Sequence, residues 1–314
     1  MTGRGRYCRR MTSAPSGMQW TIEAAGRRAV VVEVGGGLRL FEVDGQSVLD
    51  GYAEDEMCPA SAGRVLIPWP NRIRDGRYSF GGRDHQLAVT EPAKHNASHG
   101  LVNWVRWRCA AQEPGSVTVE HGLVPQPGYP WPLLLRTQWT VGADGLRAEH
   151  TITNLGAEPC PFGLGTHPYL MPPGGSVDDL TLRVPGHTRL LVDGRSLPIG
   201  AVRVTGSEYD FTEGRRVGVA VLDTAFGDLE RAADGSSSVR LSTSDGRWLE
   251  VWADAAFRWW QVFTADTLAP PRRRRSMAVE PMTCPPDAFR SGRDVVTLEP
   301  GEPWQGVWGI RTGT

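Results

Sequence analysis

The chain lacks the features that would tie it to a membrane, to nucleic acid or to an oxidising compartment. No apolar run approaches the roughly 20 residues that cross a bilayer, and no signal-peptide pattern follows the charged first ten residues. The formal net charge is only −1 over 314 residues, which argues against a polyanionic partner. The chain has five cysteines: Cys8, Cys58, Cys109, Cys160 and Cys284. They include no CxxC pair, so neither a disulfide framework nor a zinc site is indicated, and a cytoplasmic location is expected.

Metal-ligand spacing is also missing from the seven histidines, which form no HExxH or similar pattern. His95 and His99 lie four residues apart, but the nearby proline, asparagine and glycine argue against a helix that would place both on one face. The basic run Arg272–Arg275 follows two prolines and is interpreted as a solvated loop rather than a phosphate site.

Long helical periodicity is absent, and short segments with period-two alternation take its place. Strands are predicted over 28–34, 38–43, 116–121, 134–141, 146–154, 217–222, 239–242, 248–252 and 261–264. Asp-Gly pairs at 44–45, 144–145, 234–235 and 245–246 predict tight hairpins between them. With 38 glycines and 24 prolines, the pattern predicts an all-β sandwich. One domain is expected over 18–314, preceded by a disordered extension over 1–17.

The chain does contain a His and a Glu that each precede a proline in a short motif, Thr166–Tyr169 (THPY) and Val279–Thr283 (VEPMT). Because proline disfavours the α region for the residue before it, His167 and Glu280 should project from extended backbone in a fixed direction. Histidine titrates near neutrality, and a desolvated glutamate becomes a better base. The two are therefore a candidate acid/base pair, although either one alone could equally precede an ordinary loop proline.

Tryptophan is abundant, with 12 copies, and five of them lie near polar motifs: Trp69, Trp104, Trp107, Trp259 and Trp260. Aromatic faces match the C–H faces of pyranose rings, but tryptophan also fills cores, which is the simpler interpretation for any single one. The Arg, Asn, His and Gln residues beside them favour a sugar site.

A series of motifs, in order and along nearly the whole chain, resembles the aldose 1-epimerase (galactose mutarotase) family. In the first half these are 63–80 (GRVLIPWPNRIRDGRYSF), 98–100 (SHG) and 165–169 (GTHPY). In the second half they are 222–226 (LDTAF), 261–264 (QVFT), 279–289 (VEPMTCPPDAF) and 298–302 (LEPGE). Each fragment alone is weak, and their order and number carry the resemblance.

The resemblance implies a large antiparallel β-sandwich that binds a free hexose and interconverts its α and β anomers. It implies that Glu280 is the base and His167 the acid of ring opening and reclosure, and that four residues bind the sugar: Arg72, His99, Asp223 and Gln261. No metal or other cofactor is implied, and a small-molecule sugar is the expected partner rather than nucleic acid or membrane. Either a monomer or a homodimer is compatible with the sequence.

Departures from the family pattern concern substrate preference. Leu170 follows the His-Pro-Tyr motif where an aromatic is common, Phe263 replaces a frequent Tyr, and the second glycine after His99-Gly100 is missing. The tryptophan-rich version resembles a bacterial subgroup whose sugar need not be galactose.

Two alternatives remain open at the level of sequence. One is an epimerase for a hexose 6-phosphate or another charged hexose, for which Arg74, Arg77 and Arg272–Arg275 offer cations. The other is a non-catalytic carbohydrate-binding protein, against which the presence of a matched acid and base argues.

Overall fold

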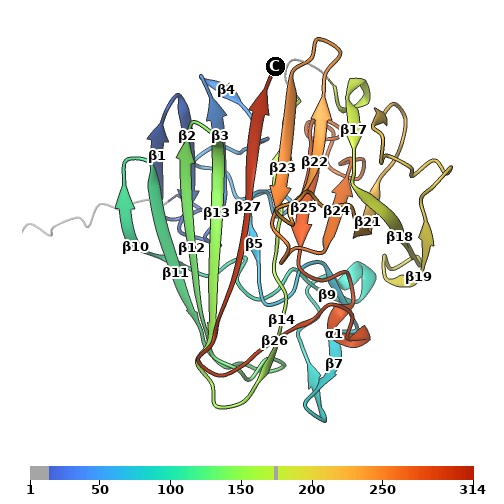
Figure 1. The fold of residues 1–314 in the computed structure, drawn as a ribbon. Helices are drawn as coiled ribbons and strands as arrows, with labels where there is room; N and C mark the ends of the chain where they lie inside the picture. Colours follow the sequence, from blue (N-terminus) through green and yellow to red (C-terminus); the bar gives the residue numbers. More distant parts are fainter. Residues whose placement is uncertain (1–13, 173–175) are drawn as a thin grey trace, which may run out of the picture.

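The computed structural model describes residues 14–172 and 176–314, and it consists almost entirely of antiparallel sheets (Figure 1). The largest sheet has nine strands, in the order β10 (Arg108–Glu113), β11 (Ser116–Leu123), β12 (Leu133–Gly142), β13 (Gly145–Asn154), β27 (Pro303–Gly313), β23 (Trp248–Ala253), β22 (Ser237–Ser242), β17 (Thr181–Arg183) and β20 (Arg215–Arg216). The next has the order β19 (Pro198–Arg203), β18 (Gly186–Val192), β21 (Asp223–Leu229), β24 (Trp259–Phe263), β25 (Met277–Met282), β15 (Gly165–Thr166) and β5 (Val65–Leu66), with β16 (Tyr169–Leu170) also paired to β25.

A smaller sheet and three ribbons complete the fold. The four-stranded sheet has the order β1 (Gln19–Ala24), β2 (Arg27–Val32), β3 (Leu38–Val43) and β4 (Gln46–Ser47). The ribbons are β6 (Arg72–Arg74) with β9 (Asn96–Ser98), β7 (Arg77–Phe80) with β8 (Arg83–Gln86), and β14 (Cys160–Phe162) with β26 (Val296–Leu298). Helical structure in the described residues is limited to η1 (Pro92–Lys94), η2 (Val177–Asp179) and α1 (Ala288–Ser291). None of these helices is long and apolar enough to cross a membrane.

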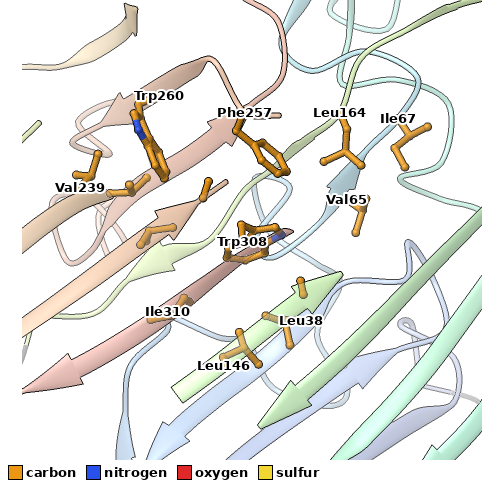
Figure 2. Close-up of a cluster of buried hydrophobic side chains, with 14 of the residues drawn as sticks. Leu38, Val65, Ile67, Leu146, Leu164, Val239, Phe257, Trp260, Trp308 and Ile310 are labelled. Atoms are coloured by element: carbon orange, nitrogen blue, oxygen red, sulfur yellow. The ribbon is translucent and has the colours of Figure 1, made fainter. Parts of the chain in front are cut away.

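The core lies between the nine-stranded sheet and the two sheets behind it (Figure 1). On β12, alternate residues from Leu133 to Val141 are buried, as period-two patterning requires. Figure 2 shows Trp308 of β27 in the middle of this core, with side chains of the second sheet, such as Trp260, and of its own layer, such as Ile310, around it. The all-β prediction is confirmed.

Most predicted strands and hairpins are also confirmed, with ends that differ by one or two residues. At the β3–β4 turn, Asp44 and Gly45 have φ of 49° and 77°, the left-handed pair that a tight hairpin favours. Between β12 and β13 the turn residues are Ala143 and Asp144, and Gly145 already belongs to the strand.

The strand predicted over 217–222 was wrong, because this segment is a loop after the short β20. Gly218 has φ of 54°, and the apolar residues Val219 and Val221 are 95% and 63% exposed. Arg274 explains the difference: its guanidinium donates to the carbonyl oxygens of Gly218 (2.8 Å) and Ala220 (3.0 Å), so these carbonyls bind a side chain instead of a neighbouring strand.

The extension expected over 1–17 falls largely outside the described residues. Within its described end, Ser16 is buried, accepts a backbone hydrogen bond from Val34 (2.9 Å) and donates to the Tyr52 hydroxyl (3.3 Å). Ser16 is therefore packed onto the sandwich, while Pro15 beside it is exposed.

Candidate active site

A polar pocket of about 630 Å³ lies on the eight-stranded sheet and brings together residues from distant parts of the chain. Strand alternation builds its floor, since Trp260 and Val262 of β24 and Val279 of β25 point into the core. The intervening Gln261 and Glu280 therefore point to the opposite face, and they are register partners on adjacent strands. Five of the six predicted site residues line this pocket: Arg72, His99, His167, Asp223 and Glu280.

His167 and Glu280 face each other at 3.4 Å, measured from Nε2 to Oε1. The backbone of His167, between β15 and β16, is held by hydrogen bonds to Gly63 (2.8 Å) and Arg64 (3.1 Å). Its ring stacks on Tyr169 with centroids 4.9 Å apart. Both side chains are buried, 7% and 3% exposed, yet His167 Nδ1 and Glu280 Oε2 have no hydrogen-bond partner among the described residues. Most buried polar atoms have a hydrogen-bond partner, and an atom without one on a pocket wall can be completed by a ligand or water.

The electrostatic setting of this pair favours its neutral forms. Burial raises the pKa of Glu280 well above its usual value, the charge of Asp223 adds to this, and Arg72 opposes it. Burial lowers the pKa of His167 to about 3, with smaller contributions from His99 and Arg72. The pocket thus favours a neutral imidazole next to a protonated carboxyl group.

Arg72 and His99 reach the pocket through the β6–β9 ribbon, in which Arg72 pairs with Ser98. The Arg72 guanidinium donates to both carboxylate oxygens of Glu91, with Nε at 2.8 Å and Nη2 at 3.0 Å. His99 follows β9 with φ of 61°, and its ring meets that of His167 edge-on at 5.6 Å. Burial, followed by the charge of Arg72, lowers the pKa of His99 to about 3, so the second imidazole is neutral too.

Asp223 and Gln261 form a hydrogen-bonded pair on adjacent strands, with the amide Nε2 donating to Oδ1 over 2.6 Å. Asp223 is exposed at the start of β21, so it is a strand residue rather than the turn residue that its sequence context also allowed. Gln261 is buried beneath it and does not itself line the pocket. Its Oε1 has no partner among the described residues. Gln261 therefore holds the carboxylate that faces the cavity.

The five tryptophans near polar motifs fall into two groups, one exposed in the pocket and four buried in the interior. Of the five near polar motifs, Trp104 lines the pocket and is 59% exposed. The ring of Trp104 lies over the buried Arg64 guanidinium at 5.0 Å. The other four are at most 2% exposed and fill the interior, as the simpler interpretation predicted.

The loop between β24 and β25 forms part of the pocket wall through Thr267 and Leu268. Two members of the basic run hold it: Arg272 pairs with Asp50 (3.2 Å), and Arg274 pairs with Asp266 (2.7 Å). Their side chains are only 19% and 18% exposed, so the interpretation of a solvated run was wrong for these two. The physical reason is a pair of carboxylates that sequence does not place: the buried Asp50 on a distant segment and the partly buried Asp266 of the same loop.

Sequence reasoning also missed two charged pocket residues, Glu91 and Lys94. Both lie around η1, a short helical turn inside a segment read as loop. Lys94 carried a signal that could have found it, since the chain contains no other lysine.

The comparison with known families places this chain among the isomerases. The chain belongs to the aldose 1-epimerase family, whose model matches residues 18–311. It is 33% identical over 289 residues to the uncharacterized protein YihR of Escherichia coli K12, a match that covers 92% of this chain and 91% of YihR.

Solved structures share the fold at lower identity. An aldose epimerase homologue from C. elegans has a TM-score of 0.83 and 19% identity, over 94% of this chain and 99% of that one. Galactose 1-epimerase from Lactobacillus acidophilus has a TM-score of 0.77 and 21% identity, over 94% and 95% of the two chains. These likenesses confirm the sandwich that the motifs implied.

Proposed function

We propose that this protein interconverts the α and β anomers of an aldohexose, with Glu280 as the base and His167 as the acid. The observation that carries the proposal is the 3.4 Å separation of His167 Nε2 and Glu280 Oε1 in the pocket. Mutarotation removes a proton from the anomeric hydroxyl and adds one to the ring oxygen, and both oxygens are bonded to C1. An acid and a base that serve them must therefore lie close together, as these two side chains do.

The proton count of the pair fits this reaction. An imidazolium beside a carboxylate and an imidazole beside a carboxylic acid carry the same number of protons, one more than a neutral imidazole beside a carboxylate. In ring opening, the Glu280 carboxylate takes the proton of the O1 hydroxyl, the C1–O1 double bond forms, the C1–O5 bond breaks, and the His167 imidazolium protonates O5. The pair ends in the neutral form that burial favours. Rotation about C1–C2 and reversal of both transfers then gives the other anomer.

The remaining residues supply binding and orientation. The fork of donors on Arg72 is fixed by Glu91 and can donate further hydrogen bonds to sugar oxygens. Asp223, which the family motifs assign to sugar binding, can accept from adjacent hydroxyls. Gln261 was assigned to sugar binding as well, but its hydrogen bond to Asp223 supports a positioning role instead. Neutral His99, whose Nδ1 has no partner among the described residues, offers a hydrogen bond to the ring oxygen or a nearby hydroxyl.

Polarimetry of freshly dissolved α-D-galactose and α-D-glucose tests the proposal; galactose is included because the L. acidophilus neighbour is a galactose 1-epimerase. The protein should speed the decay of rotation to an unchanged final value. Glu280→Gln and His167→Asn should each lower kcat about 10²- to 10⁴-fold, and calorimetry should show that Glu280→Gln still binds sugar. Glu250→Gln, which neutralises a buried carboxylate on the nine-stranded sheet, is the matched control and should keep its activity.

Two results would overturn the proposal. Equal loss of sugar binding and turnover in Glu280→Gln would make this carboxylate a binding group. No acceleration for any aldose, neutral or charged, would leave a carbohydrate-binding role without catalysis.

A further inference from the structure

Lys94 stands out on composition and on position. It is the only lysine in a chain with 34 Lys and Arg residues together, and it lies on the wall of the candidate active-site pocket. Arginine and lysine are not equivalent, because the ammonium is a compact charge with three donors and the guanidinium is a planar fork. A chain that uses arginine at every other cationic position has a lysine at this one.

The arginines around Lys94 form ion pairs with carboxylates, and Lys94 does not form one with any described residue. Arg72 is bound by both oxygens of Glu91, and Arg195 donates to Asp75 (2.8 Å). Lys94 Nζ donates to the Ser196 hydroxyl over 2.7 Å, and it forms no ion pair with any carboxylate of the described residues. One of its three protons is thus used by a neutral partner, and two remain.

The ammonium is held in place rather than free to swing. Lys94 ends η1, and its backbone N–H donates to Glu91 (3.2 Å). Its carbonyl oxygen accepts from Arg195 Nε (2.8 Å), while Ser196, in the β18–β19 connection, holds the side chain from the other side. A half-buried lysine anchored at both ends contributes a fixed positive charge to the pocket.

The arginines that the sequence offered for a charged substrate do not take this role. Arg74 pairs with Asp193 (3.3 Å) and Arg77 donates to Gln86 (2.8 Å), and neither lines the pocket. Within the pocket, Arg72 is paired with Glu91, Asp223 accepts from Gln261, and burial favours protonated Glu280. Lys94 acts on Glu91 only through longer-range charge, and it is the pocket cation without a carboxylate at ion-pair distance among the described residues.

We propose that Lys94 binds an anionic substituent on the aldose, so that the substrate class is a hexose carrying a carboxylate, phosphate or sulfonate group. The proposal rests on the proposed mutarotase function of the same pocket. Two free ammonium protons match terminal oxygens of such a group, and charge-assisted hydrogen bonds are roughly twice as strong as neutral ones. The anomeric centre then lies at the His167–Glu280 pair and the anionic group at Lys94.

Anomerisation of D-glucose, D-glucuronate, D-glucose 6-phosphate and 6-deoxy-6-sulfo-D-glucose tests the proposal, with exchange NMR as the readout. At least one anionic sugar should exceed glucose in kcat/KM in the unmodified protein. Lys94→Met should reduce the ratio of anionic to neutral kcat/KM by about 10- to 100-fold, chiefly through KM. The KM for the preferred anion should rise with added salt, because salt screens the charge.

Arg147→Met on the nine-stranded sheet is the matched control, since it removes one positive charge at a half-exposed site outside this pocket and should leave the ratio unchanged. If Lys94→Met lowers neutral and anionic kcat/KM equally, Lys94 is a structural residue and the proposal fails. A preference for glucose over all three anionic sugars overturns it as well, while leaving mutarotation intact. Failure of every sugar to anomerise faster would instead refute the mutarotase function itself.

Discussion

Replacing Glu91 by Gln would test whether the Arg72 clamp organises the pocket. In the protein, both carboxylate oxygens of Glu91 accept from Arg72, and Oε2 also accepts from Asn96 Nδ2 at 3.0 Å. A glutamine keeps the shape but turns an amide NH2 toward the guanidinium, so one hydrogen bond and the counter-charge are lost. The two side chains are 25% and 15% exposed, which reduces the effect below that of a fully buried pair. We expect a loss of about 1–3 kcal/mol in the free energy of unfolding.

The functional effect follows from the charges that Arg72 already attracts. Burial opposes a higher pKa of Arg72, but the bond to Glu91 and the charges of Asp223 and Glu280 outweigh it and raise that pKa. Released from Glu91, the guanidinium should move toward Glu280 and lower the pKa of this carboxyl group. Because the base acts when deprotonated, the acid limb of kcat/KM should move to lower pH, and kcat/KM at its optimum should fall about 10-fold through lost orientation.

The assay is a pH profile of anomerisation together with urea unfolding. Glu42→Gln is the matched control, because Glu42 pairs with Arg28 at 3.2 Å on the four-stranded sheet and is similarly exposed, at 22%. It should leave the profile unchanged. If Glu91→Gln lowers stability but keeps both kcat/KM and the position of the acid limb, Glu91 only supports the fold. A limb that moves to higher pH would refute the electrostatic reasoning.

Three further changes have defined outcomes. Burial lowers the pKa of His150 to about 3. Below the unfolded pKa of roughly 6.5, the unfolded chain therefore binds a proton that the folded chain does not. Through this residue, the free energy of unfolding should fall by about 2 kcal/mol from pH 6.5 to pH 5. His150→Gln should remove this share of the slope in urea unfolding and leave the shares of His99 and His167, whose pKa values burial also lowers. An unchanged slope would contradict the assignment. Trp104→Ala should raise the KM for sugar about 10-fold while Trp104→Phe keeps most affinity; equal effects would exclude stacking. Arg272→Met removes an ion-pair partner from Asp50, whose side chain is 2% exposed. The free energy of unfolding, measured by thermal or urea unfolding, should fall by about 3 kcal/mol. Unchanged stability would show that Ser276 and Arg275 are sufficient partners for this carboxylate.

Strand positions were predictable because their signal is local. Period-two alternation and Asp-Gly turns are properties of short windows, and β3 was predicted to the residue. The failure over 217–222 has a non-local cause, since the carbonyls of that loop are bound by Arg274, more than 50 residues away in the chain. Apolar residues such as Val219 mimic a strand there while lying in solvent.

Single candidate site residues could be named from the sequence for a different reason. The proline after His167 and after Glu280 fixes local backbone direction, and the motifs around them carry the family resemblance. The contacts between pocket residues were harder to predict, because they join positions that are far apart in the chain. Glu91 binds Arg72 from 19 positions away, and Ser196 binds Lys94 from 102 positions away.

The sequence by itself determined the all-β class, the hairpins, the family and the identities of the candidate acid and base, because each depends on neighbouring residues or on motifs in a fixed order. Only the tertiary structure decided what those residues face. It places His167 within 3.4 Å of Glu280 across 113 residues of chain (280 − 167), buries both, and leaves Lys94 without a carboxylate partner among the described residues. Strand order and burial set these distances and the pKa shifts that follow from them, and neither is a property of a local segment.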